Sequence, residues 1–344
     1  MRRLKIAQVA PPWYPIPPKG YGGIELVVSL LADGLVDAGH DVTVFATGDS
    51  KTKGKLSFVY KECAPAEIGK IDREICHLMP AYRQADEFDI IHDHTMCGPA
   101  IGNFIDTPML HTLHGPFTEP VKKFYASLNH GVFFNAISNY QRSCFPELNY
   151  VGTIYNSVML DWYPLQERKK DYLLFLGRMN PEKGVREAVQ VANRLGEKLV
   201  MVVKMVEPSE VEYFEEQVEP LIGDNVEVIG QVDVRTKARL VKDAKCLLYP
   251  IQWPEPFGLV MAEAMACGTP VVAIRNGSVP EVIVDGETGF IVESVDEMVE
   301  AVKHVGEIDP KDCRAWVAER FSVGRMVGDY LAAYETILTE RGRL

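Results

Sequence analysis

Two glutamates lie eight residues apart in the stretch "PEPFGLVMAEAMACGTPVVA", residues 254–273. Glu255 stands in a proline-containing loop, and Glu263 stands in the apolar helical run that follows. A carboxylate can accept hydrogen bonds from two vicinal hydroxyls, which suits Glu263 to a ribose and Glu255 to a hexose. The alternative is a loop carboxylate and an exposed helix residue. Against it, Glu263 is flanked by alanines, and a carboxylate in so apolar a helix should be buried and need a partner.

Backbone groups between the two glutamates could bind an anion. Phe257, Gly258 and Leu259 stand at the expected start of the helix, where N–H groups have no partner within the helix. The helix dipole adds partial positive charge at the same end. We therefore predict an oxyanion or phosphate site at these three residues.

Two cations stand in "GRMNPEKG", residues 177–184. Arg178 is expected at the end of a strand, and Lys183 one turn into the next helix. Two fixed cations at such an edge suit a diphosphate, whose charge must be neutralised as it leaves. The alternative is a surface Arg and Lys near a helix start. A lysine is disfavoured at a helix N-terminus, however, and this favours the functional interpretation.

A glycine pair follows the first expected strand, in "PPKGYGGIE", residues 17–25. Gly22 and Gly23 would let the backbone approach a ligand at a helix N-terminus, where an anion is favoured. The spacing is not GxGxxG, so a dinucleotide-binding interpretation is weak. Taken alone, the segment fits a tight turn without a ligand equally well.

Short apolar runs alternate with amphipathic helices along the whole chain, which predicts βα units on parallel sheets. A polar stretch at 165–172 separates two such series, so we predict an α/β protein with two facing, Rossmann-like, doubly wound domains and a cleft between them. The expected strands are 4–10, 41–47, 88–94, 109–115, 133–138 and 152–157, then 172–178, 198–204, 226–230, 246–250, 270–274 and 289–292. The expected domains are 1–165 and 166–320, with a terminal helix in 321–344 that could pack back on the first domain.

The composition argues against several classes of protein. The chain has 344 residues and a formal net charge of −12, which disfavours nucleic acid as a partner. Its seven cysteines form no CxxC pair, which fits a reducing cytoplasm better than a disulfide framework. No apolar run approaches the length of about 18 residues needed for a membrane span, and the N-terminal segment does not read as a signal peptide. We expect a cytoplasmic protein, with peripheral contact at the inner face of the membrane left open.

These segments together resemble glycosyltransferase family 4 (GT4, glycosyl transferases of group 1), whose members are retaining enzymes with the GT-B fold. The E-x7-E motif is Glu255 to Glu263, and "GRMNPEKG" matches the Arg/Lys segment of the family. "GSVPEVIVDGETGFIV" (277–292) matches the segment after the second glutamate. In the first half, "GYGGIE", "DIIHDHT", "TLHG", "AISNYQR" and "IYNSV" occur in the expected order. The resemblance covers nearly the whole chain.

The resemblance implies an acceptor-binding first domain and a nucleotide-sugar-binding second domain. Glu263 would hold the nucleotide ribose, and Glu255 would contact the hexose near its 3- and 4-hydroxyls. Arg178 and Lys183 would bind the diphosphate and stabilise it as it departs.

The remaining contacts implied by the resemblance come from three segments. Gly22 and Gly23 would approach the phosphates, and the N–H groups of residues 257–259 would bind sugar hydroxyls or phosphate. His114, in "TLHG", would lie beside the anomeric carbon and the 6-hydroxyl. Without the resemblance, a strand-end histidine capped by a backbone carbonyl would be the preferred interpretation of His114.

We expect no metal and no cofactor. The chain lacks the DxD carboxylate pair of the other major glycosyltransferase fold. The alternative is a metal at "HDH" (92–94), but adjacent strand residues alternate faces, so Asp93 should point away from both histidines. Arg178, Lys183 and helix N-termini would replace the cation.

The function expected from the resemblance is metal-independent transfer of a hexosyl group, with retention, from a nucleotide-diphosphate sugar to a hydroxyl acceptor. UDP-glucose is the first choice of donor and GDP-mannose the second. The acceptor could be a small molecule, a saccharide or a lipid-linked hydroxyl, since "KTKGKLSFVYK" (51–61) mixes lysines with aromatics as a lipid-facing surface would. The alternatives are a nucleotide-sugar epimerase of the same fold and a non-catalytic sugar-nucleotide-binding protein.

Overall fold

The computed structural model describes residues 2–20, 22–128 and 131–343, and the chain divides into two compact units. The first unit is Met1–Ser157 together with Val323–Leu344, and the second is Val158–Ser322. The boundary expected at 165/166 therefore lies inside the second unit.

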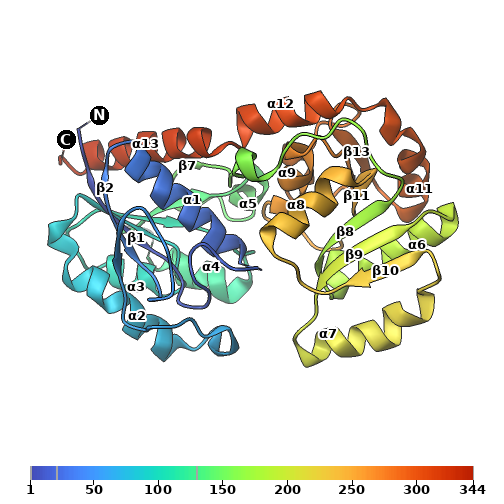
Figure 1. Ribbon diagram of the computed structural model, residues 1–344. Helices are drawn as coiled ribbons and strands as arrows, with labels where there is room; N and C mark the ends of the chain where they lie inside the picture. Colours follow the sequence, from blue (N-terminus) through green and yellow to red (C-terminus); the bar gives the residue numbers. More distant parts are fainter. Residues whose placement is uncertain (1, 21, 129–130, 344) are drawn as a thin grey trace. The chain divides into compact units, whose positions relative to one another are not determined.

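In the described part of the chain, the first unit contains a seven-stranded parallel sheet with the order β3-β2-β1-β4-β5-β6-β7. Figure 1 labels β1, β2 and β7 of this sheet. The order reverses between β1 and β4, and ligands of doubly wound sheets bind beyond the carboxyl ends of the strands at such a point. Its strands are β1 (Lys5–Val9), β2 (Asp41–Phe45), β3 (Lys55–Ser57), β4 (Ile90–Asp93), β5 (Met109–Thr112), β6 (Phe133–Ala136) and β7 (Tyr150–Thr153).

Two details of this sheet differ from the sequence prediction. Strand β3 was not expected, because it is short and lies in a lysine-rich segment without an apolar run. Strand β7 begins at Tyr150, before the predicted stretch 152–157, and the residues after Thr153 are irregular.

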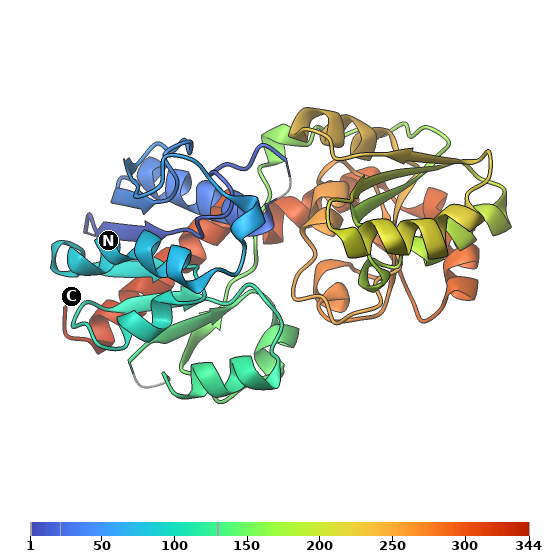
Figure 2. The same ribbon diagram turned by 90° about the horizontal axis from the view of Figure 1, so that it is seen from below.

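Helices pack on this sheet and enclose a buried core around Phe45, Leu78 and Phe134. The described helices of the unit are α1 (Gly23–Asp37), α2 (Ile71–Arg83), α3 (Gly98–Gly102), α4 (Glu119–Ala126), α5 (Asn139–Ser143) and α13 (Val323–Glu340). Figure 2 shows α13, in red, lying against the elements of the first unit. A Cβ atom placed on Gly34 would lie 2.6 Å from Val327 Cγ2, so α1 and α13 pack closely.

The second unit, as described, has a six-stranded parallel sheet with the order β10-β9-β8-β11-β12-β13, which reverses between β8 and β11. Its strands are β8 (Leu173–Arg178), β9 (Leu199–Lys204), β10 (Val226–Ile229), β11 (Cys246–Tyr249), β12 (Val271–Ile274) and β13 (Gly289–Val292), all of which coincide closely with predicted strands. Its helices are α6 (Val185–Leu195), α7 (Pro208–Tyr213), α8 (Val234–Asp243), α9 (Leu259–Ala266), α10 (Val279–Val282), α11 (Val295–His304) and α12 (Pro310–Arg320).

The terminal helical region is broken where the units divide. Helix α12 ends at Arg320 and α13 begins at Val323, and α12 remains in the second unit. Phe321, which follows α12, is buried, and its ring packs against Trp316 and Phe257 of the second unit. Over the described residues, we find no helix with the length and apolar character that a membrane span requires.

Candidate active site

The residues predicted in the second half lie on or follow neighbouring strands of one sheet. Arg178 is the last residue of β8, and the loop that carries Glu255 follows β11. These strands pair with each other at the point where the strand order reverses. The topology thus puts both segments at the edge where doubly wound sheets bind ligands.

Lys183 does not lie in a helix turn of α6, which corrects the sequence prediction. It ends the single 3-10 turn Pro181–Lys183, where Asn180 Oδ1 accepts a hydrogen bond from the Lys183 N–H (3.2 Å). Gly184 then adopts φ +71°, and a Cβ there would collide with the carbonyl oxygen of Pro250. Because the turn is pressed against the loop after β11, Lys183 is directed toward that loop.

Glu255 is held by three donors on a single oxygen. Lys183 Nζ forms an ion pair with Oε2, Tyr249 Oη donates to it over 2.9 Å, and Trp253 Nε1 donates over 3.0 Å. The Lys183 ammonium also lies 4.9 Å from the centre of the Trp253 ring. No hydrogen bond from the described residues ends on Oε1, so this oxygen keeps its lone pairs for hydroxyl donors.

The backbone at the start of α9 is fixed by glycine and by packing. Gly258 has φ +77°, and a Cβ there would lie 2.9 Å from Tyr249 Oη. The buried Phe257 ring contacts Phe321, with ring centres 5.5 Å apart. Leu259 is the first helical residue, so its N–H is one of the groups without a partner in the helix.

Glu263 is buried, with 2% of its surface exposed. Lys237 Nζ donates to Oε1 over 2.6 Å, and Tyr163 Oη donates to the same oxygen over 2.7 Å. Oε2 is also buried and has no partner among the described residues. The prediction that this carboxylate is buried and paired is therefore confirmed, and one of its oxygens remains unsatisfied.

Sequence reasoning missed Lys237. It lies in the first turn of α8, after the N-cap residue Asp233, and no motif connects it with Glu263. The position of this lysine beside a helix N-terminus could have indicated that it has an acidic partner, because that position is unfavourable for a cation without one. The same signal was used for Lys183.

Arg178 pairs with two carboxylates. Its Nε lies 2.8 Å from Glu210 Oε1, and Nη2 lies 3.0 Å from Glu207 Oε1. Burial acts to raise the pKa of Glu210, but the backbone N–H groups of Val206 and Glu207, together with Arg178, lower it overall. Glu210 is therefore a fixed anion that orients the guanidinium, and it too was missed.

The structure thus separates the predicted residues of this unit into three groups. These are Lys183 with Glu255, Glu263 with Lys237, and Arg178 with its two glutamates. A Cβ built on Gly177 would lie 3.6 Å from Lys183 Cβ, so the lysine lies beside the residue that precedes Arg178. No hydrogen bond among the described residues joins Glu255 to Glu263.

The glycine pair predicted for phosphate binding precedes α1 in the first unit. Gly22 has φ +150° and caps the helix, and Gly23 is its first residue; Tyr21 lies outside the described residues. A Cβ on Gly22 would lie 3.1 Å from Glu25 Oε2, so this carboxylate lies against the loop. Burial raises the pKa of Glu25 to about 7, although a backbone hydrogen bond partly opposes the shift.

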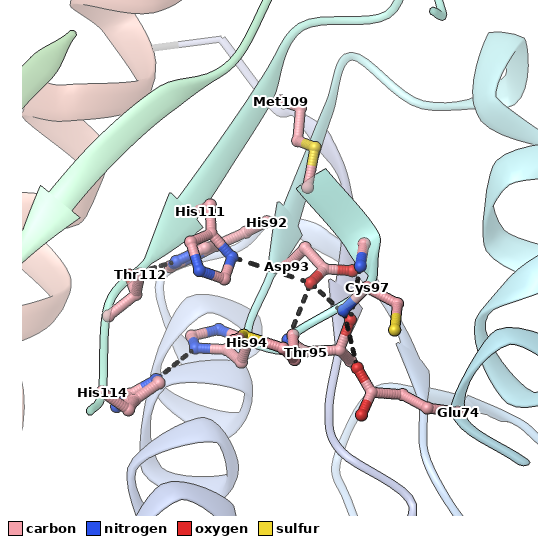
Figure 3. A network of polar contacts seen from close by, with 12 residues as sticks. Glu74, His92, Asp93, His94, Thr95, Cys97, Met109, His111, Thr112 and His114 are labelled. Atoms are coloured by element: carbon pink, nitrogen blue, oxygen red, sulfur yellow. Dashed lines mark hydrogen bonds and ion pairs between the residues drawn. The ribbon is translucent and has the colours of Figure 1, made fainter. Parts of the chain in front are cut away.

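His114 follows β5 and contacts another histidine (Figure 3). His114 Nε2 lies 2.9 Å from His94 Nδ1, so the ring is anchored by a side chain and not by a backbone carbonyl. Burial and, to a smaller extent, the neighbouring His111 lower the pKa of His114 to about 3. His114 is therefore a neutral imidazole at physiological pH.

Asp93 lies apart from the two histidines that flank it in "HDH" (Figure 3). Its carboxylate accepts hydrogen bonds from Tyr82 Oη (2.9 Å) and from the N–H (2.7 Å) and Oγ1 (2.8 Å) of Thr95. The rings of His92 and His94 instead pack together, with centres 4.2 Å apart. Within the described residues, no group of three or more His, Cys, Asp or Glu side chains is arranged to hold a metal ion.

Two family models match successive parts of the chain. The model of the glycosyl transferases group 1 matches residues 163–319, and that of Glycosyltransferase Family 4 matches residues 21–149. The first covers all the groups described around Arg178, Lys183, Glu255 and Glu263. The second covers the glycine loop and the histidines.

Curated relatives match over most of their length. The chain is 27% identical to a phosphatidyl-myo-inositol mannosyltransferase of Mycolicibacterium smegmatis, covering 93% of this chain and 88% of that protein. It is 24% identical to an N-acetyl-alpha-D-glucosaminyl L-malate synthase of Bacillus anthracis, covering 93% and 95%.

Solved structures share the fold. The chain superposes on AviGT4, a glycosyltransferase involved in avilamycin A biosynthesis, with a TM-score of 0.74 and 27% identity over 98% of both chains. A sucrose-phosphate synthase from Thermosynechococcus elongatus gives a TM-score of 0.80 at 19% identity, covering 98% and 100% of the two chains. The two parallel sheets, the family matches and these neighbours agree, and the chain belongs to the group 1 glycosyl transferases of family GT4, with the GT-B fold and a glycosyltransferase activity.

Proposed function

We propose that this glycosyltransferase moves a hexosyl group from a nucleotide-diphosphate sugar to a hydroxyl acceptor, with retention and without a metal ion. The observation that carries the proposal is the buried Glu263 carboxylate. One of its oxygens holds Lys237 and Tyr163, and the other is buried without a partner in the described residues. A buried, unsatisfied carboxylate oxygen is costly, and two ribose hydroxyls would satisfy it.

Lys183 and Arg178 are proposed to bind the diphosphate. Both lie at the carboxyl end of β8, and Lys183 is only 19% exposed. Lys183 is paired with Glu255, and Arg178 with Glu207 and Glu210, so a bound diphosphate would exchange these carboxylates for its own oxygens. Partly buried cations stabilise a departing phosphate more than exposed ones because water screens them less.

Glu255 and His114 are proposed to bind the hexose. Glu255 offers Oε1 to sugar hydroxyls while three donors hold Oε2, and the neutral His114 can exchange hydrogen bonds without bringing charge to the reaction centre. UDP-glucose remains our first choice of donor. GDP-mannose is the second, and the name of the mycobacterial relative supports mannosyl transfer.

Retention is proposed to follow from attack on the same face of the sugar. The bond between C1 and the phosphate oxygen breaks, the acceptor oxygen bonds to C1, and the acceptor proton passes to the departing phosphate. Lys183, Arg178 and the N–H groups of residues 257–259 would stabilise the phosphate charge.

The acceptor is proposed to bind the first unit. Lys51, Lys53, Lys55 and Lys61 are exposed and flank Phe58 in the sequence; Phe58 is 51% exposed, and Lys53 pairs with Asp37. Such a basic and apolar segment suits an anionic lipid surface, and the mycobacterial relative is named for a lipid acceptor. A lipid-linked acceptor, with the protein working at the inner face of the membrane, is therefore proposed beside a saccharide acceptor.

The direct test incubates the protein with UDP-, GDP- and ADP-hexoses, with and without EDTA, and monitors the sugar by NMR. The proposal predicts slow donor hydrolysis or transfer, an α-configured product from an α-configured donor, and no effect of EDTA. Interconversion of the donor without an acceptor would identify an epimerase instead. Binding of a donor with no turnover under any condition would identify a non-catalytic protein.

A further inference from the structure

A chain of buried hydrogen bonds ends at His114 (Figure 3). His114 Nε2 lies 2.9 Å from His94 Nδ1, and His94 Nε2 lies 3.0 Å from Gln8 Oε1. Gln8 comes from β1, His94 follows β4 and His114 follows β5, and these three strands are neighbours in the sheet. Gln8 is 0% exposed and His94 is 4% exposed, so water does not compete for the contact between them, and the contact of His94 with the half-buried His114 is partly buried.

Both rings of the chain are neutral. Burial lowers the pKa of His94 well below its usual value, and the nearby His92, His114 and His111 lower it further. The pKa of His114 is lowered to about 3, again chiefly by burial. A neutral imidazole has one N–H donor and one lone-pair acceptor, so a hydrogen bond at one nitrogen decides the role of the other.

The hydrogen bonds therefore have a direction. Gln8 Oε1 can only accept, so His94 Nε2 carries the proton and His94 Nδ1 is an acceptor. His114 Nε2 must then donate to His94, which leaves the lone pair on His114 Nδ1. We infer that Gln8 and His94 are positioning residues, which fix His114 as the Nε2–H tautomer so that Nδ1 accepts a hydrogen bond from a hydroxyl of the donor sugar.

The C-terminal helix holds the other end of the chain. Gln8 Nε2 donates to Tyr334 Oη over 3.0 Å, and Tyr334 belongs to α13. Tyr334 Oη lies 2.7 Å from His92 Nδ1, and His92 Nε2 lies 2.7 Å from Thr112 Oγ1. These contacts orient the Gln8 amide with its oxygen toward His94, so α13 acts on the tautomer of His114 through Gln8 and His94.

The inference rests on the proposed function in one respect, namely that His114 binds the donor sugar. Its chemical consequence is specific. A His114 that is an acceptor at Nδ1 cannot protonate a leaving group at neutral pH, but it can recognise a hydroxyl, which we take to be the 6-hydroxyl. A donor that lacks this hydroxyl should gain nothing from the positioning by His94.

The test is a two-bond ¹H–¹⁵N NMR spectrum of the full chain, labelled with ¹⁵N-histidine, at pH 7. Signals of His114 are assigned by their loss in His114→Asn. The expected result is a protonated Nε2 and an unprotonated Nδ1. In His94→Asn the side-chain oxygen replaces the Nδ1 acceptor and the tautomer should persist, whereas in His94→Phe the acceptor is lost and both tautomers should appear.

His111→Phe is the matched control. His111 is 3% exposed, and its Nε2 contacts Tyr125 Oη over 3.1 Å, outside the chain of Gln8 and His94. This variant should keep the His114 tautomer, whatever it costs in stability. If His94→Phe does not fold, the wild-type spectrum and His94→Asn still decide the tautomer.

Kinetics then separate positioning from mere stability. His94→Phe should lower kcat/KM about tenfold for the hexose donor, as expected for one weakened hydrogen bond, and should have no effect with the 6-deoxy donor. His94→Asn should stay within about threefold of wild type. An Nδ1–H or doubly protonated His114, or an equal loss with both donors, would overturn the inference. If the chain transfers no sugar, the proposed function fails, but the NMR spectrum still shows whether His114 is the Nε2–H tautomer. The two proposals can therefore fail independently.

Discussion

Lys237 Nζ lies 2.6 Å from Oε1 of Glu263, although 26 residues separate them along the chain. The lysine lies in the first turn of α8, and the glutamate lies in α9. Since Tyr163 Oη also donates to Oε1, the ionised carboxylate is stabilised at one oxygen while the other remains buried and unpartnered among the described residues. The pair therefore leaves one carboxylate oxygen of a buried, apolar helix without a donor among the described residues.

Lys237→Met should destabilise the second unit. The change leaves the buried Glu263 with Tyr163 as its remaining donor, and an uncompensated buried charge is costly. Because the lysine side chain is 23% exposed, we expect a loss of about 1–3 kcal/mol in unfolding free energy. Urea unfolding at pH 7 measures it. Equal stability of the variant and the wild type would show that the ion pair contributes nothing.

Lys183→Ala should lower the rate of transfer at least about 100-fold, a typical loss for one charge-stabilising group. The fold should survive, because Tyr249 and Trp253 still donate to Glu255. Steady-state kinetics with the identified donor measures the effect. Lys303→Ala is the control, since Lys303 is half exposed and pairs with Glu300. Unchanged turnover in Lys183→Ala would remove its proposed phosphate role.

Gly258→Ala should impair both stability and transfer. The residue has φ +77°, and the new Cβ would lie 2.6 Å from Met261 Cε and 2.9 Å from Tyr249 Oη. Gly286→Ala is a matched control, with φ +78° and no atom within 4 Å of the new Cβ. The control should lose about 1 kcal/mol from backbone strain alone and keep its activity. If both variants transfer sugar equally well, the close packing at Gly258 is irrelevant to the site.

Glu25→Gln should change how stability depends on pH. The unfolded carboxyl loses its proton near pH 4.5, whereas burial keeps the folded one protonated up to about pH 7. The folded state binds more protons in that window, so its stability falls as the pH rises from about 4.5 to about 7. The variant should remove up to about 3 kcal/mol of that fall. Urea unfolding at pH 5 and pH 8 tests this, and parallel pH profiles for the two proteins would contradict it.

The regular elements of the second unit could be predicted because each strand is a short apolar run followed by a helical pattern. Strand β3 was not predicted, because Lys55–Ser57 is mostly polar and has no apolar run. It is a strand because it forms hydrogen bonds with β2. The sequence prediction placed Lys183 in the following α-helix, whereas it ends a separate 3-10 turn. Gly184 ends this turn in the left-handed conformation, and the sequence does not reveal that conformation.

Site residues with a local signature could be predicted, and those that act through space could not. The spacing of Glu255 and Glu263, with a proline-containing loop before an apolar helical run, is visible in one short stretch. The partners that hold Glu263 are not, because Lys237 lies in α8 and Tyr163 follows the turn Leu160–Trp162, and both meet α9 only in the folded unit. Likewise, nothing in the sequence connects Tyr334 with Gln8 across the first unit.

Donor binding with the metal removed tests the central claim most directly. Calorimetric titration in EDTA with UDP-glucose and GDP-mannose would compare the wild type with Lys183→Ala and Glu263→Gln. We predict that the wild type binds at least one of these donors, and that each variant binds it at least about tenfold more weakly, a loss of about 1.4 kcal/mol. Equal affinity in all three proteins, or wild-type binding that requires a divalent cation, would contradict the account.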